Sequence, residues 1–159
     1  QQIHRGLLLN DLDEVLQKYN IQGSDLELEI TESALLDNTA NVKTLLHAIK
    51  QRDISIALDD FGTGYSSLAY LTEYPIDVLK IDRAFISKIG DQKQEAIVNA
   101  MIAMGKSMGL KLVAEGVETE EQVIYLQKQQ CDFLQGYFFS RPLHPNQIIQ
   151  YLQSNTYIS

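Results

Sequence analysis

Residues 55–68, which read SIALDDFGTGYSSL, decide how the rest of the chain is interpreted. An apolar run with the character of a β-strand ends in two adjacent aspartates, and a glycine-rich segment follows at once. The alternation of side chains along a strand places Ile56 and Leu58 on one face and Asp59 on the other. Asp60 then lies where the strand turns into the loop. Because neighbouring carboxylates repel each other, one of the two keeps its proton unless a cation lies between them.

Length, charge and cysteine content limit the class of protein. The 159 residues are 45% hydrophobic and 21% charged, which is typical of one globular domain. The formal net charge of −8 argues against binding to a nucleic-acid polymer. Cys131 is the single cysteine, which excludes a disulfide within the chain and fits a reducing compartment. Without a signal peptide or an apolar run that could cross a bilayer, we expect a cytoplasmic domain; a parent protein anchored through other segments is compatible with this.

Strand-like and helix-like segments alternate along the chain. The predicted strands are residues 26–31, 54–60, 76–82, 111–116 and 132–139. Such alternation predicts a parallel sheet with helical crossovers, and these sheets bind ligands at the carboxyl ends of their strands. Thr119 and Gln122 form a capping-box pattern that opens one of the helices.

Two further segments have plain structural interpretations. Ile97, Met101 and Met104 follow helical spacing over residues 95–108, which predicts core filling rather than a cofactor site. The glycines at 62 and 64 resemble a phosphate cradle, but the Gly-Lys-Ser/Thr ending of a P-loop is missing. We therefore predict a mobile loop there.

Polar residues recur near the carboxyl ends of the five predicted strands: Glu29, Asp59, Lys80, Glu115 and Gln135. One such residue is common at a strand end, but five at equivalent positions indicate a site. Carboxylates gathered at one mouth repel one another without a cation, and oxygen ligands favour Mg²⁺ or Mn²⁺. The three histidines lie away from the strand ends, which argues against an imidazole zinc site. Lys80 either faces an attacking water or forms a structural salt bridge with Asp82 or Glu115.

Five motifs follow one another along the chain: LEITE at 28–32, DDFGTGYSSL at 59–68, KID at 80–82, AEGVE at 114–118 and QGY at 135–137. Through these ordered motifs the chain resembles the EAL family of cyclic di-GMP phosphodiesterases. The resemblance implies an α/β fold, a TIM-like (β/α) barrel of the EAL type of which about five C-terminal strand–helix units are present. It also implies hydrolysis of cyclic di-GMP to linear pGpG with two Mg²⁺ or Mn²⁺ ions.

The resemblance also implies roles for individual residues. Glu29 and Asp59 match ligands of one metal ion, while Asp59, Asp60 and Glu115 match ligands of the other. Lys80 matches the lysine at the catalytic water, so the catalytic set is Lys80, Glu115, Asp59 and Asp60. Gln135, at the rim, and Asp82 are the expected substrate-binding residues, and Glu32 matches a glutamate that anchors the loop after Asp60. Glu118 and Arg141 lie in matching motifs without an implied role.

The chain also departs from the family pattern. The Glu-Ala-Leu motif and a metal-binding asparagine are absent, and the sequence matches the family from the helix before the fourth barrel strand. We therefore expect residues 1–159 to be the C-terminal portion of a single EAL domain from a larger protein. By itself it should be an impaired enzyme, and its open sheet edges should favour self-association.

The expected partners follow from the same resemblance. They are cyclic di-GMP, a second copy in a homodimer of the parent, and upstream sensor or GGDEF-type domains. Two other functions stay open: a receptor that binds cyclic di-GMP without cleaving it, and a Mg²⁺-dependent lyase on the same fold. The residue types at the matched positions are those of the enzyme, which favours hydrolysis.

Overall fold

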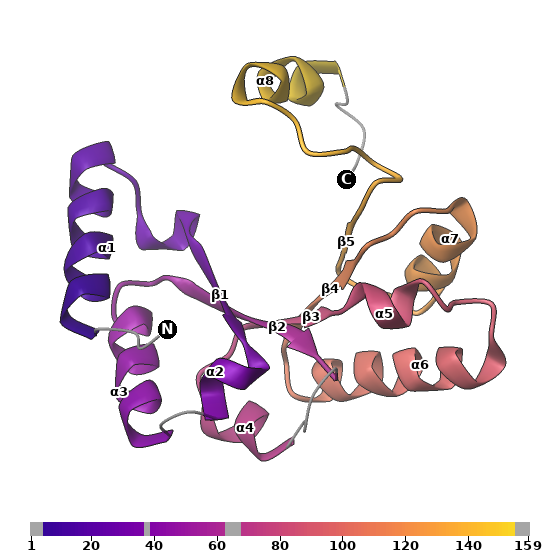
Figure 1. Ribbon diagram of the computed structural model, residues 1–159, viewed down its shortest axis with the longest axis horizontal. Coiled ribbons are helices and arrows are strands. Elements are labelled where there is room, and N and C mark those ends of the chain that lie inside the picture. The colour runs from indigo at the N-terminus through magenta and orange to yellow at the C-terminus, as the bar shows by residue number, and fades with distance from the viewer. Residues whose placement is uncertain (1–4, 37–38, 63–67, 155–159) are drawn as a thin grey trace.

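A five-stranded parallel sheet organises the computed structural model, which describes residues 5–36, 39–62 and 68–154. Its strands are β1 (Glu27–Thr31), β2 (Ser55–Phe61), β3 (Val78–Ile81), β4 (Lys111–Glu115) and β5 (Phe133–Gln135). They lie in chain order, and each adjacent pair is parallel. The predicted α/β class with a parallel sheet is confirmed. The described sheet is open, with β1 and β5 at its two edges (Figure 1).

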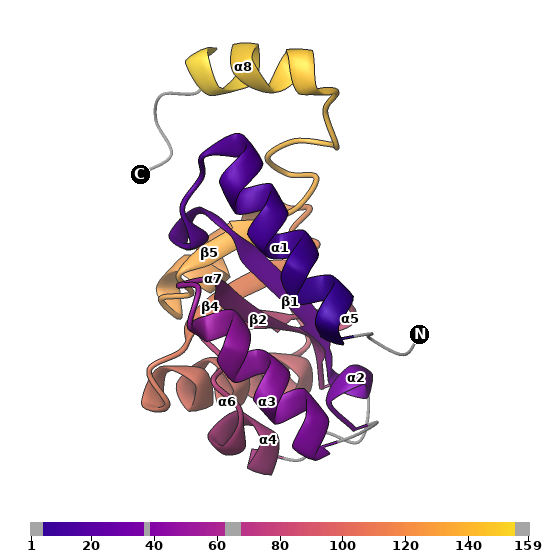
Figure 2. The ribbon, with the colours of Figure 1, turned by 90° about the vertical axis from the view of Figure 1, so that its left-hand side faces the viewer.

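Helices connect the strands. They are α1 (Arg5–Tyr19), α2 (Glu32–Leu36), α3 (Thr39–Lys50), α4 (Leu68–Glu73), α5 (Arg83–Ile86), α6 (Gln92–Ser107), α7 (Glu120–Lys128) and α8 (Pro145–Ser154), with a 3₁₀ turn at Gly23–Asp25. Helices α3, α4 and α6 lie along one side of the sheet, whereas α8 stands apart from the other elements in both views (Figures 1 and 2). None of the helices in the described ranges is long and apolar enough to cross a membrane.

The hydrophobic core lies between the sheet and the helices that pack against it. Ile56 and Leu79 on the strands are fully buried, as are Val98 on α6 and Leu126 on α7. Burial of one such side chain contributes about 1.5–3 kcal/mol to folding. Because the apolar residues of each strand point toward the helices, the alternating polar residues are left on the opposite face of the sheet.

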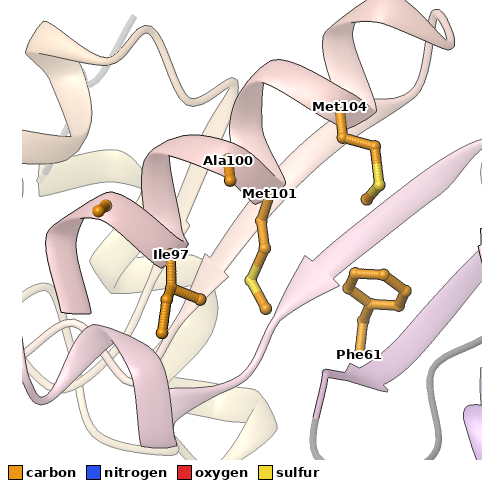
Figure 3. Close-up of a pocket in the computed structure, with 6 residues that line it drawn as sticks. Phe61, Ile97, Ala100, Met101 and Met104 are labelled. Carbon is orange, nitrogen blue, oxygen red and sulfur yellow. The ribbon is translucent and has the colours of Figure 1, made fainter. Parts of the chain in front are cut away.

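Helix α6 bears out the predicted core role of its methionines in part, because Met101 and Met104 are half-buried and pack against the hydrophobic core. The residues that α6 buries are Val98, Ile102 and Gly105, whereas Ile97 is 41% exposed. Ile97, Met101 and Met104 line an open apolar groove of about 360 Å³ together with Phe61 at the end of β2 (Figure 3). Met101 and Met104 therefore contact the core on one side and line the groove on the other, while Ile97 is open to solvent.

Several element boundaries also differ from the prediction. Strand β5 has three residues, because Gly136 approaches the backbone of the segment after β4; a Cβ there would lie 2.1 Å from the carbonyl oxygen of Val117. The short helices α2 and α5, which follow β1 and β3 directly, were not predicted, because four or five residues carry too little periodicity. Residues 63–67 of the predicted mobile loop lie outside the described residues.

Candidate functional site

A buried lysine joins three strands at the polar face of the sheet. Lys80 of β3 is only 4% exposed. Its Nζ atom lies 2.5 Å from Oε1 of Glu29, 2.7 Å from Oε1 of Glu115 and 3.5 Å from Oδ1 of Asp59. Burial lowers the pKa of the amine, but hydrogen bonds to Glu115 and Glu29 and the charge of Asp59 outweigh that effect, so the pKa is raised. Lys80 is therefore held as an ammonium ion among carboxylates.

The register of the parallel strands explains why these four side chains meet. Lys80 is the register partner of Val113, which lies two residues before Glu115. Alternate residues of a strand share a face, so Lys80 and Glu115 point to the same side. Glu29 and Asp59 reach the same face from β1 and β2, on the other side of β3. The structure thus brings together four of the five predicted strand-end residues, and it contains the Lys80–Glu115 salt bridge that the sequence left as an alternative.

An irregularity in β2 sets the positions of the two aspartates. The pairing of β2 with β3 shifts between Leu58 and Phe61. Asp60, which the sequence placed at the end of the strand, lies within it and adopts a left-handed backbone conformation with φ of 57°. Its amide N–H donates to Oδ1 of Asp59 at 3.0 Å. A register shift of this kind, as in a β-bulge, redirects side chains that a regular strand would send to opposite faces.

Asp60 is electrostatically part of the same cluster. Partial burial raises its pKa, as do the negative charges of Asp59 and Asp82, while the charge of Lys80 acts in the opposite direction. Glu115 behaves similarly: burial raises its pKa even though its hydrogen bond to Lys80 opposes the change. The cluster holds more negative charge than one ammonium group neutralises.

The other predicted site residues lie nearby but in different settings. Gln135 is exposed at the end of β5, as the register partner of Glu115. Asp82 caps α5, where its side chain accepts a hydrogen bond from the Ala84 amide at 2.7 Å. Glu32 is buried at the start of α2, but most of the loop that it was predicted to anchor lies outside the described residues.

The motif residues without an implied role each have a visible partner. Glu118 forms an ion pair with Arg83 of α5 at 2.7 Å. Arg141 lies over the ring of Tyr137, 5.0 Å from its centroid. Sequence reasoning missed Arg83, because no local pattern indicates which charged residue will face Glu118 from another strand–helix unit.

The donor types of the cluster fit a hard divalent cation. Glu29, Asp59 and Glu115 offer carboxylate oxygens, the ligands that Mg²⁺ and Mn²⁺ prefer. Within the described ranges, however, no three acidic, histidine or cysteine side chains are grouped closely enough to enclose one ion. The carboxylates are arranged around Lys80, so the donor chemistry fits such an ion while the arrangement is not a closed cage.

Gly116 fixes the backbone directly after Glu115, and its replacement tests that constraint. Its φ is +68°, and an added Cβ would lie 2.3 Å from Cγ of Arg83. We expect Gly116→Ala to lower the free energy of unfolding by about 1–3 kcal/mol, from backbone strain and steric overlap, as measured by urea denaturation. Gly109→Ala is the matched control, because Gly109 has φ of +74° with open space around it. Equal losses in the two variants would show that the contact with Arg83 is unimportant.

Comparison with known proteins identifies the fold. Residues 1–142 match the EAL domain family. The chain is 45% identical over 140 residues to the cyclic di-GMP phosphodiesterase NbdA of Pseudomonas aeruginosa, covering 87% of this chain and 18% of NbdA. Among solved structures, it resembles the PaMucR phosphodiesterase in complex with c-di-GMP, with a TM-score of 0.86, 40% identity, and coverage of 92% of this chain and 59% of that one.

A third relative has been solved with a metal. The chain resembles Klebsiella pneumoniae BlrP1 in its manganese and cyclic di-GMP complex, with a TM-score of 0.76, 31% identity, and coverage of 86% of this chain and 34% of that one. The chain therefore spans about a fifth of the length of NbdA and about three fifths of the PaMucR structure. The family match covers most of the chain, and the neighbouring structures share its parallel α/β architecture. This chain belongs to the EAL domain family.

Proposed function

We propose that this chain supplies part of a site that hydrolyses cyclic di-GMP to linear pGpG with two divalent metal ions. The observation that carries the proposal is the convergence of Glu29, Asp59 and Glu115 on the buried ammonium of Lys80. The relatives named for cyclic di-GMP hydrolysis support the choice of substrate. The manganese complex of BlrP1 supports the choice of Mn²⁺, with Mg²⁺ as the chemically similar alternative.

Each residue has a chemical task in this proposal. Glu29 and Asp59 would hold one ion, and Asp59, Asp60 and Glu115 the other. Bound divalent ions neutralise phosphate charge and lower the pKa of a bound water. Hydrolysis adds the water oxygen to one phosphorus and breaks the bond from that phosphorus to a ribose 3′ oxygen, which takes up a proton.

Lys80 and Gln135 act on the reactants from the protein side. The Lys80 ammonium orients the attacking water or stabilises the negative charge that develops on the phosphate oxygens. Gln135 is placed beside Glu115 at the rim, where its amide can donate to and accept from a nucleotide. We assign Asp82 to substrate binding as well, although its side chain also caps α5. Glu32 completes the proposal as the residue that anchors the loop after Asp60.

Incubation of the full-length protein with cyclic di-GMP and Mn²⁺, followed by chromatography and mass spectrometry of the products, tests the proposal. We expect pGpG to accumulate in the presence of Mn²⁺ or Mg²⁺ and to disappear when the ions are removed with a chelator. A protein that binds cyclic di-GMP without releasing pGpG would instead be a receptor. No binding or cleavage of cyclic di-GMP, together with Mg²⁺-dependent elimination from a different substrate, would support lyase chemistry on this fold.

A further inference from the structure

We propose that Gln122 is a positioning residue that couples the backbone after Glu115 to the backbone after Lys80. Gln122 lies in the first turn of α7 and is 7% exposed. A buried amide side chain is costly unless its donors and acceptor are paired. The partners of this side chain lie in two different strand–helix units, which a helix cap alone does not require.

The carbonyl end of Gln122 holds the segment that follows Glu115. Its Oε1 accepts hydrogen bonds from the amide of Glu118 at 2.7 Å and from the amide of Thr119 at 3.1 Å. Only Gly116 and Val117 separate Glu115 from this pair of amides, and Val117 is fully buried. The backbone on the C-terminal side of Glu115 is thereby fixed.

The amide end of the same side chain holds the segment that follows Lys80. Nε2 of Gln122 donates to the backbone carbonyl of Ile86 at 3.2 Å. Ile86 is the last residue of α5, which begins directly after the Lys80-Ile81-Asp82 stretch, and it is fully buried. One buried amide is therefore bonded to both backbone segments. We infer that it restrains the position of Glu115 relative to Lys80.

A second link between the same segments is weaker. The ion pair of Arg83 with Glu118 connects α5 to the segment after Glu115, but both side chains are exposed. Exposed ion pairs contribute little to rigidity, whereas the hydrogen bonds of a buried amide are costly to break. Gln122 therefore dominates the coupling.

This inference rests on the proposed function for its kinetic part only. In the full-length protein, Gln122→Met keeps the length of the side chain and removes its three hydrogen bonds. We expect kcat for cyclic di-GMP hydrolysis to fall about tenfold to a hundredfold with KM nearly unchanged, because a small misplacement of reacting groups has effects of that size. Gln127→Met, an exposed position on the same helix, should leave kcat unchanged.

A destabilised control separates positioning from general stability. Leu126→Ala removes a fully buried side chain from the same helix, and none of the three side-chain hydrogen bonds of Gln122 involves Leu126. Hydrogen exchange by mass spectrometry should show faster exchange of both residues 116–119 and residues 78–86 in Gln122→Met. In Leu126→Ala, faster exchange should be confined to α7 and the residues beside it.

The outcomes are distinct. If Gln122→Met loses no more kcat than Leu126→Ala at a temperature where both are folded, Gln122 is only structural and the inference is overturned. If the wild-type protein does not hydrolyse cyclic di-GMP, the proposed function fails, but hydrogen exchange still tests the inference. Unchanged protection of residues 78–86 from exchange in Gln122→Met would refute it.

If Gln122→Met does not fold, Gln122→Glu is the second variant. It keeps the acceptor for both amides and lacks the donor to Ile86. An unchanged kcat in that variant would refute the coupling.

Discussion

Lys80→Met is expected to lower both the stability of the fold and the activity of the full-length protein strongly. It removes the ammonium group of Lys80, which lies between Glu29, Asp59 and Glu115, and leaves their charges without that partner. Removing one partner of a buried ion pair typically costs about 3–5 kcal/mol. We expect the free energy of unfolding, measured by urea denaturation at neutral pH, to fall by an amount at the lower end of that range. The reason is that Glu29 is half-exposed and can be solvated.

The same substitution should reduce the proposed hydrolysis of cyclic di-GMP by the full-length protein about a hundredfold or more, since the charge that we propose to stabilise the transition state is lost. Lys88→Met is the matched control, because Lys88 is an exposed lysine close in sequence to Lys80. Glu115→Gln added to Lys80→Met should recover part of the stability and none of the activity. Wild-type turnover in Lys80→Met would exclude a catalytic role for this lysine.

Asp59→Asn and Asp60→Asn are expected to differ in their effects on metal binding. Asp59 is the proposed ligand of both ions, whereas Asp60 is the proposed ligand of one. We therefore expect Asp59→Asn to weaken both Mn²⁺ binding events in calorimetric titration and to abolish hydrolysis. Asp60→Asn should spare the first ion, yet turnover should fall about a hundredfold, equivalent to about 3 kcal/mol. Cyclic di-GMP binding should suffer less than turnover in Asp60→Asn.

Asp53→Asn provides the control for both variants. Asp53 has φ of 60°, close to that of Asp60, and it is exposed just before β2, at the far end of the strand from the two aspartates. Its replacement should change neither Mn²⁺ binding nor turnover. The two-metal mechanism would be abandoned if Asp59→Asn bound two ions with wild-type affinity and stayed active.

Local patterns of the sequence were enough to predict the architecture and the identity of the central cluster. The alternation of apolar and polar residues places Asp59, Lys80 and Glu115 on one face of their strands, because the period of two is a property of each strand by itself. The capping box of Thr119 and Gln122 was likewise predicted and is confirmed. Parallel pairing then brings the strand ends to one edge of the sheet. The proposed roles of these residues stay predictions.

The tertiary structure decided what depends on contacts between distant segments. The sequence left open whether Lys80 pairs with Asp82 or Glu115; the register of β3 with β4 brings Glu115 within 2.7 Å, whereas Asp82 caps α5. The register shift around Asp60 depends on the pairing of β2 with β3, which no local pattern encodes. Gln122 appeared in the sequence only as a cap, and its bond to Ile86 spans 36 residues. Helical spacing gave the apolar flank of α6, but only packing against the sheet determined which side of that helix is buried, because periodicity defines a face and not its partner.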